Sequence, residues 1–246
     1  MSLRRFFSKL YTAAVRQRSH DLLVMRVLPF IFLGVLPAAA AEPSYVARYD
    51  FYAGFAYLHT PILNLSTRGY HLQAAINTKS WLALGFDYSH SNGSLTLYPK
   101  YLPTDLRNQV DGILQFAPPG YDPGLTTDVN TQTFAMGPAL VFRKIKGMAF
   151  ILHPSIGAVR EYAVPYPTDT LKNIIVSNVV PARKKLDWQG FYGIGGGIDF
   201  RVAKHMSIRL HTDFVWDHLF DDIIRDGRWT VRTSFGPAFH FGRDIR

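Results

Sequence analysis

The sequence predicts an all-β fold, an eight-stranded antiparallel up-and-down β-barrel that spans a membrane. Apolar and polar residues alternate with a period of two in eight segments, which is typical of strands whose two faces meet different surroundings. The connections between these segments are alternately short and long, as in outer-membrane barrels. Charged residues make up only 18% of the 246 residues, whereas soluble domains contain about 25%.

The eight expected strands lie in order along the chain. They cover residues 49–60, 69–78, 81–98, 130–143, 148–163, 186–202, 206–220 and 229–242. Tight connections are expected near 79–80, 144–147 and 203–205, and longer ones at 61–68, 99–129, 164–185 and 221–228. The segment 99–129 contains five prolines, which exclude a central strand, so we expect a long surface loop there. Almost no helix is expected.

The two faces of each expected strand differ in side-chain size. In 206–216 one face is bulky and apolar, and the other carries Ser207, Arg209, His211 and Asp213. In 192–202 the polar face includes Gly195 and Gly197, which an open solvated sheet does not need. A narrow closed barrel does need small inward residues, and closure leaves no unpaired edge in lipid. We therefore expect the apolar face to meet lipid and the polar face to line the lumen.

The inward face is expected to form a network of paired charges, because an isolated charge in a narrow interior is costly. The residues expected in this lumen network are His71, Asp87, Asp199, Arg201, Arg209, His211, Asp213 and Arg232. The structural interpretation is that the network packs the lumen and fixes the strand register. The functional interpretation is a gate or a path for small solutes.

Parity predicts the register of two hairpins, because cross-strand partners must share a face. A three-residue turn at 203–205 places Asp199 opposite Arg209. The alternative register would oppose Arg201 and Arg209, which is unfavourable for like charges. The same argument at 78–80 places His71 opposite Asp87. Two inward ion pairs are therefore expected, Asp199–Arg209 and His71–Asp87.

The N-terminal region predicts export. Residues 25–42 read MRVLPFIFLGVLPAAAAE, which is a basic start, an apolar run and then small residues. This layout is typical of a secretory signal peptide cleaved after Ala40 or Ala41, and the apolar run is too short to span a bilayer. Met25 is a candidate translation start. We expect a signal peptide with an N-terminal extension at 1–41 and a single barrel domain at 42–246.

Composition argues against several other classes of protein. The chain has 27 Lys+Arg and 18 Asp+Glu; removal of residues 1–41 takes away six basic and one acidic residue, which leaves 21 against 17, a net charge of +4. No basic stripe with interleaved aromatic residues is present, so nucleic acid is not expected as a partner. The chain has no cysteine, and its histidines lack the i, i+4 spacing of a helical zinc site. Neither a metal nor a cofactor is expected.

The C-terminal segment SFGPAFHF, Ser234 to Phe241, resembles the insertion signal read by the barrel-assembly machinery. The matching residues are Ser234, Gly236, Phe239 and Phe241. With the strand architecture over about residues 45–242, the chain resembles the small eight-stranded outer-membrane barrels, the OmpA transmembrane domain and the OmpX group. The tail Gly242 to Arg246 departs from the family, whose last strand usually ends the chain.

The resemblance implies a location in the outer membrane of a Gram-negative-type bacterium. It also implies contacts with outer-membrane lipid and lipopolysaccharide, and with the assembly machinery and periplasmic chaperones during biogenesis. A monomer is expected.

The basic loop residues Arg183, Lys184 and Lys185 are either solvated charges or contacts for lipopolysaccharide phosphates.

The sequence is compatible with three functions. The first is a structural or surface-interaction role, because an eight-stranded barrel is just wide enough to be filled by side chains. The second is a narrow pore for ions or small solutes. The third is an enzyme that acylates or deacylates lipid A. Its candidate residues are His90, Ser91, Glu161 and His218, but their spacing identifies no nucleophile–base pair. Such an enzyme needs a groove for an acyl chain, and no proline pair is expected to open one; Pro138, Pro154 and Pro237 are expected to face lipid.

Overall fold

The computed structural model describes residues 45–217, 219–220, 223–224 and 228–246. The expected signal peptide at 1–41 and the candidate His218 therefore lie outside the described residues. Of Asp217 and Arg228 only the backbone is described.

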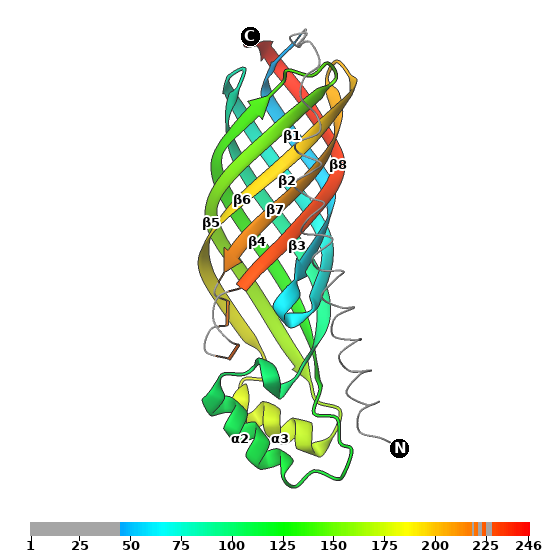
Figure 1. The fold of residues 1–246 in the computed structure, drawn as a ribbon, viewed down its shortest axis with the longest axis vertical. Helices are drawn as coiled ribbons and strands as arrows, with labels where there is room; N and C mark the ends of the chain where they lie inside the picture. The colour runs from blue at the N-terminus through cyan, green and yellow to red at the C-terminus, as the bar shows by residue number, and fades with distance from the viewer. Residues whose placement is uncertain (1–44, 218, 221–222, 225–227) are drawn as a thin grey trace, which may run out of the picture. The chain divides into compact units, whose positions relative to one another are not determined.

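The described chain forms a closed antiparallel barrel in which each strand pairs with the next and β8 pairs with β1. The strands are β1 (Ala47–Thr60), β2 (Leu65–Lys79), β3 (Leu82–Leu97), β4 (Leu125–Phe142), β5 (Met148–Tyr166), β6 (Lys185–Ala203), β7 (Met206–Asp217) and β8 (Arg228–Asp244). Figure 1 shows them strongly tilted, with the C-terminus and the short turns at one end. We call this the turn end and the opposite end the loop end. The predicted fold class is confirmed.

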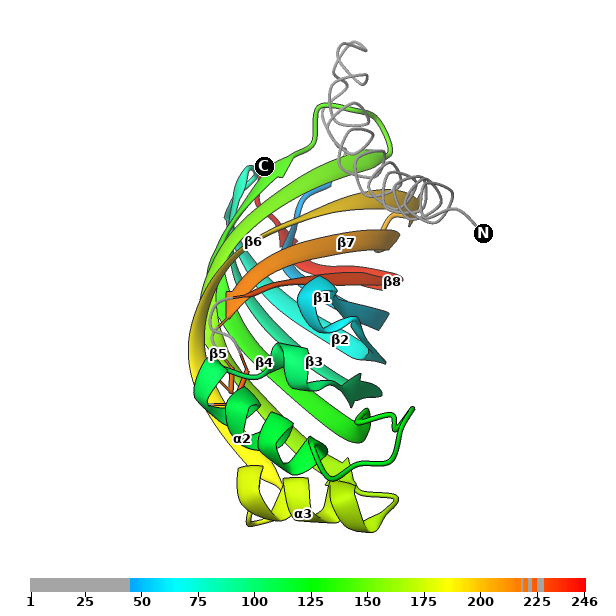
Figure 2. The ribbon, with the colours of Figure 1, turned by 60° about the horizontal axis from the view of Figure 1, so that its bottom comes forward.

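The loop end contains helices that the sequence pattern did not predict. Two short 3₁₀ helices, η1 (Pro61–Leu63) and η2 (Pro99–Tyr101), and two α-helices, α2 (Thr104–Leu114) and α3 (Thr170–Val179), lie in the long connections. Figures 1 and 2 both show α2 beside α3. A long connection is present as expected, but the expectation of almost no helix was wrong, and β4 begins at Leu125 instead of residue 130. Pro103 stands just before the first turn of α2, where a proline costs no helical hydrogen bond.

Apolar contacts hold the two α-helices together. Val110 of α2 and Ile175 of α3 are buried in one cluster with Leu102, which follows η2. The carboxylate of Asp169 caps α3 by accepting a hydrogen bond from the backbone N–H of Lys172 at 2.9 Å. A side chain that satisfies such a free donor at a helix start stabilises the helix. None of the helices in the described ranges is long and apolar enough to cross a membrane.

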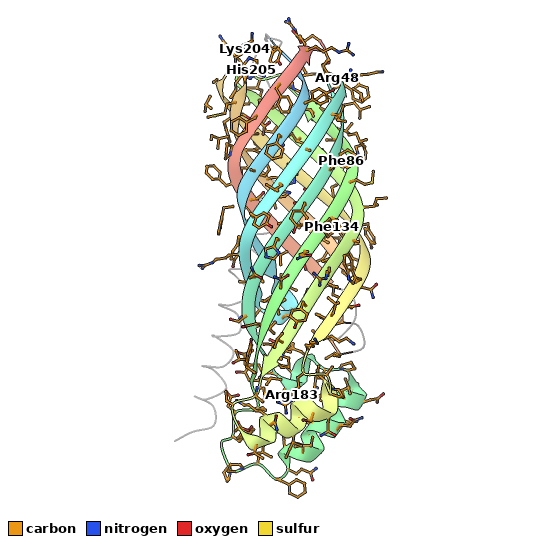
Figure 3. All side chains as sticks on the ribbon, turned by 180° about the vertical axis from the view of Figure 1, so that it is seen from behind. Arg48, Phe86, Phe134, Arg183, Lys204 and His205 are labelled. Carbon is orange, nitrogen blue, oxygen red and sulfur yellow. The ribbon has the colours of Figure 1, made fainter. Side chains whose placement is uncertain are left out.

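The alternation of the strands separates an apolar outside from a polar inside. Large hydrophobic side chains on the outer face, such as Phe86 and Phe134, are each 43% exposed, and Figure 3 shows both on the outside of the wall. The inward positions near the middle of the barrel are buried and polar. The faces expected from the sequence are therefore the observed ones.

The register of the β6–β7 hairpin places Asp199 opposite Arg209 and Gly195 opposite Asp213, as parity requires. The turn itself differs from the expected one. Ala203 pairs with Met206, so the turn has two residues, and the register shifts between Arg201 and Ala203. This irregularity adds one residue to the β6 strand, which restores the parity that a two-residue turn alone would break.

A similar irregularity makes the predicted register of the β2–β3 hairpin wrong by one inward-facing pair. Lys79 pairs with Leu82, and the register shifts between Asn77 and Lys79. Asp87 consequently lies opposite Gln73, and His71 lies opposite Ser89. The expected contact still forms on the diagonal, because His71 Nε2 lies 2.6 Å from Asp87 Oδ2.

A proline pair faces across the β4–β5 seam, contrary to expectation. Pairing runs to Met136–Ile156 and resumes at Leu140–Leu152, so the register places Pro138 opposite Pro154. Proline has no backbone N–H, so neither residue can donate a hydrogen bond to this seam. His153, an inward residue discussed below, is the neighbour of Pro154.

Candidate functional site

The charged barrel lumen is the candidate functional site. Seven of the eight residues expected there are less than 7% exposed: His71, Asp87, Asp199, Arg209, His211, Asp213 and Arg232. Arg201 is half-buried near the turn end, where its Nη2 donates to the carbonyl of Tyr45 at 3.2 Å. Arg201 thus belongs to the rim of the barrel. The other charged residues gather around two arginines.

The first group, which we call the Arg209 cluster, consists of Arg209, Asp50, Asp199 and His240. Arg209 donates from Nε to Asp199 Oδ1 at 2.6 Å and from Nη2 to Asp199 Oδ2 at 2.8 Å. The same Nη2 lies 3.1 Å from Asp50 Oδ1 on β1. His240 Nδ1 is 3.2 Å from the other Asp50 oxygen. A two-pronged pairing of this kind is the strongest that a guanidinium makes with a carboxylate.

The second group, the Arg232 cluster, consists of Arg232, Asp87, Asp213, His71 and Ser89. Arg232 donates from Nε and Nη2 to Asp213 Oδ2 at 2.9 and 2.7 Å. Its Nη1 donates to Ser89 Oγ at 2.7 Å, and its Nη2 is 2.8 Å from Asp87 Oδ1. Since Arg232 lies on β8 and its last two partners lie on β3, these contacts cross the lumen.

Gln73 joins the two clusters. Its side-chain amide donates to Asp87 Oδ2 at 2.9 Å, and its carbonyl oxygen accepts from Arg209 Nη1 at 3.1 Å. The combined network contains side chains from β1, β2, β3, β6, β7 and β8. The wall formed by β4 and β5 instead presents small inward residues at this level, including Gly137, Ala139 and Ser155. Long arginines on one wall therefore face short side chains on the other.

The glycines of β6 have a steric role here. A Cβ atom on Gly195 would collide with the carboxylate of Asp213 on the neighbouring strand. A larger residue at this position would therefore displace the acid that holds Arg232. The small inward residue that the sequence analysis expects at position 195 is therefore required by the contact with the Asp213 carboxylate.

Several members of the network were not predicted from the sequence. Asp50 and His240 belong to the Arg209 cluster, Ser89 belongs to the Arg232 cluster, and Gln73 joins the two. Asp50 shares its parity with the buried Tyr52, so the alternation in β1 could have found it. The pairing of carboxylates with arginines depends on how the barrel closes between β1 and β8. The residue pattern of a single strand carries no information about this closure.

The residues of the expected insertion signal are divided between the two faces of β8. Ser234 is buried in the lumen, where its Oγ is 2.7 Å from His71 Nδ1. Gly236 is also inward. Phe239 and Phe241 are exposed on the outer face, and the ring of Phe241 lies 5.7 Å from that of Tyr49.

Among the described candidate residues for lipid chemistry, Ser91 and His90 do not come together. Ser91 is buried on the inner face, where it accepts a hydrogen bond from Thr67 at 2.9 Å. His90, the preceding residue on β3, has its side chain on the opposite face of the sheet, near Asn92. The two side chains therefore cannot act as nucleophile and base. Glu161 is buried on β5.

A second feature lies at the loop end, where the barrel mouth and the helices enclose an apolar cavity. Its volume is about 80 Å³. The lining is almost wholly apolar and includes Leu95 and Val129 of the barrel, Val110 of α2, and Ile175 and Val176 of α3. Because the charged network lies deeper in the barrel, the lumen changes from apolar at the loop end to ionic at mid-height.

The basic residues of the last long loop before β6 are spread out. Arg183 donates from Nη2 to Asn173 Oδ1 of α3 at 2.8 Å, and Figure 3 shows it close to the helices. Lys184 is exposed. Arg183 is therefore partly engaged in holding its own loop.

Comparison with known proteins finds similarity only among solved structures. No family model matches the sequence, and a search of curated proteins finds no match. Among solved structures, Ail of Yersinia pestis, determined in complex with the heparin analogue sucrose octasulfate, is 12% identical, with a TM-score of 0.47, and the match covers 80% of this chain and 99% of Ail. Neisserial surface protein A is 9% identical, with a TM-score of 0.49 and coverage of 78% and 96%. The N-terminal β-barrel domain of Pseudomonas aeruginosa OprF is 10% identical, with a TM-score of 0.41 and coverage of 79% and 98%.

Replacing Arg232 with glutamine should strongly destabilise the barrel. The change leaves Asp87 and Asp213 buried without their cation, which typically costs about 3–5 kcal/mol. Arg201→Gln is the matched control, because Arg201 is half-buried at the rim, and the expected loss there is below about 1 kcal/mol. The measurement is the denaturant midpoint of the detergent-folded protein. Equal midpoints for the two variants would contradict the assigned roles.

Proposed function

We propose that this chain is an outer-membrane β-barrel protein with a structural or surface-interaction role, its lumen closed by the charged network. The observation that carries the proposal is the pair of arginines whose hydrogen bonds join strands on different sides of the lumen. Arg232 on β8 reaches Ser89 on β3, and Arg209 on β7 reaches Gln73 on β2. A solute path would have to break these contacts.

The outer face of the barrel supports a place in a lipid bilayer. Exposed aromatic and aliphatic side chains cover it, among them Phe55, Phe86, Phe134, Ile156 and Phe235. Such a continuous apolar surface is unfavourable in water and suits lipid. Trp216 and Trp229 pack edge to face at 5.1 Å near the loop end, where tryptophan suits a membrane interface.

The loop end supports a surface role. Strands of up to 19 residues exceed the 9–11 or so that a bilayer needs, and the longest of them carry α2 and α3. Phe116, just after α2, is 84% exposed, and Ile174 of α3 is 42% exposed. With Lys184, these side chains offer apolar and cationic contacts to a partner, such as lipopolysaccharide with its acyl chains and phosphates.

A closed lumen predicts that the reconstituted protein carries no steady ion current across a planar bilayer. The double variant Arg209→Ala, Arg232→Ala should produce current steps, because it removes both cross-lumen contacts. Arg201→Ala, at the rim, should stay silent. Stable single-channel steps from the wild-type protein would favour the narrow pore over the closed barrel.

The insertion signal predicts a difference between two aromatic residues of the same strand and face. Phe241 and Phe235 are similarly exposed, at 52% and 58%, but only Phe241 is in the terminal position of the signal. We expect Phe241→Ala to lower the amount of heat-modifiable barrel in outer membranes more than Phe235→Ala does. Both variants should fold alike in detergent, which separates recognition from stability. Equal assembly in cells would refute the signal role of Phe241.

A second candidate function is the binding of a small apolar molecule at the loop end, which the apolar cavity favours. Apolar cavities of this kind are poorly hydrated and accept apolar ligands readily. The lining comes from both the barrel and the two helices, so an occupant would also bridge barrel and loops.

Methyl NMR of the protein in nanodiscs can test this candidate with a short linear alkane as the probe. Binding in the cavity should shift the methyl signals of Val110, Ile175 and Val176 saturably. Ile156 and Leu210 are the internal controls, because they are exposed on the outer face and report alkane dissolved in the lipid. Shifts confined to these two controls would exclude the cavity as a binding site.

A further inference from the structure

Three side chains on three non-adjacent strands converge inside the barrel. They are Asp87 on β3, His153 on β5 and His211 on β7, and one carboxylate oxygen and one ring nitrogen from each histidine all lie within 4.8 Å of one another. The residues are 6%, 4% and 1% exposed. His153 belongs to the β4–β5 wall, so this group spans the part of the lumen that the two arginine clusters leave to small residues.

Each of the two histidines has one ring nitrogen without a partner in the described chain. His153 Nε2 and His211 Nδ1 are fully buried and accept or donate no hydrogen bond there. Buried polar atoms are normally satisfied, and an exception requires a reason such as a bound ion or water. Two buried histidines that each keep an unpaired nitrogen, close to one another and to a carboxylate, supply the free donors that a metal ion needs.

The surrounding contacts prepare His211 to act as a ligand. Its Nε2 lies 2.7 Å from Asp213 Oδ1, and because the carboxylate can only accept, Nε2 carries the proton. The lone pair of the neutral ring is then on Nδ1, the buried free atom. A histidine that ligates a metal almost always donates its other N–H in this way. Asp87 is oriented similarly, because His71 and Gln73 both contact its Oδ2.

We propose that Asp87, His153 and His211 form a binding site for one divalent transition-metal ion of the zinc class. Two imidazole nitrogens and one carboxylate oxygen suit Zn²⁺, which binds such ligands at about 2.0–2.2 Å and keeps a fourth position for water. Ligand atoms around a tetrahedral ion lie about 3.3 Å apart.

A small cavity adjoins the two histidines. Its volume is about 30 Å³, and it is lined by both histidines and by Gly85, where a Cβ atom would come within 2.9 Å of His153 Nε2. A second cavity of about 300 Å³ lies at the turn end and is lined by Arg143 and Asp199. Asn77 lines both cavities.

The local charge favours a cation. In the Arg232 cluster the carboxylates of Asp87 and Asp213 face one guanidinium, which leaves one negative charge while the histidines are neutral. Arg232 Nη2 is 2.8 Å from Asp87 Oδ1, so an ion there would share this oxygen with Arg232. Two other groups of acids and histidines also converge, Asp50–Asp199–His240 and His71–Asp87–Asp213. Their histidines are hydrogen-bonded through both ring nitrogens, so they offer no free ligand.

The test is a titration of the full-length, detergent-folded and metal-stripped barrel with Co²⁺, followed by its visible absorption, and then with Zn²⁺ as competitor. We expect one ion per chain. His153→Gln and His211→Asn should each abolish stoichiometric binding, because each removes one free nitrogen while keeping a polar side chain of similar reach. Asp213→Asn should weaken binding about 10–100-fold, since it replaces the carboxylate that orients His211. His90→Gln, on the outer face, is the control and should bind like the wild type.

The proposal is contradicted by the following results. No binding by the wild type would show that water or a protonated histidine satisfies the cluster. Unchanged binding by the His153 and His211 variants, or an equal loss in His90→Gln, would place the ion elsewhere. If a variant fails to give the heat-modifiable band, X-ray absorption of the zinc-loaded wild type decides. Two imidazoles in the zinc shell support the site, and a shell without them refutes it.

Discussion

The structure depends on the pairing of two buried guanidinium groups inside a ring of only eight strands. A ring this small has no space for a solvated interior, so a charge on an inward position must find a partner among the other inward side chains. Arg209 and Arg232 meet this requirement with carboxylates from three other strands and from β7 itself. Because each pairing joins different strands, the same contacts that satisfy the charges also fix the register and the closure of the barrel.

This constraint explains the uneven distribution of residue size around the ring. The long arginines on β7 and β8 extend toward walls that carry Gly137, Ala139 and Ser155, while Gly195 leaves room for the Asp213 carboxylate. The charged network also separates two environments. Toward the loop end the lumen becomes apolar and merges with the core under α2 and α3, and toward the turn end it opens into a polar cavity.

The proposed metal site follows from the same geometry. The arginine clusters contain the carboxylates of β1, β3, β6 and β7, whereas His153 comes from the wall that lies outside both clusters, and its Nε2 is left without a partner in the described chain. An ion held by His153 and His211 would join β5 to β7 across the lumen. It would brace the wall in which Pro138 and Pro154 cannot donate to the β4–β5 seam. A site of this kind has no signature in sequence spacing, since its ligands lie on three separate strands.

The sequence by itself determined the strand count, the two faces of each strand and the pairing of Asp199 with Arg209, because a period of two and the parity of a hairpin are local properties. It did not determine the β2–β3 register, because the shift between Asn77 and Lys79 lies in backbone geometry that no side-chain pattern reports. The helices were missed because their apolar residues are stabilised mainly by each other and by the barrel mouth. Only the closed tertiary structure decided that Asp50 and His240 join Arg209 and that His153 approaches His211, since closure brings together strands that are far apart in the chain.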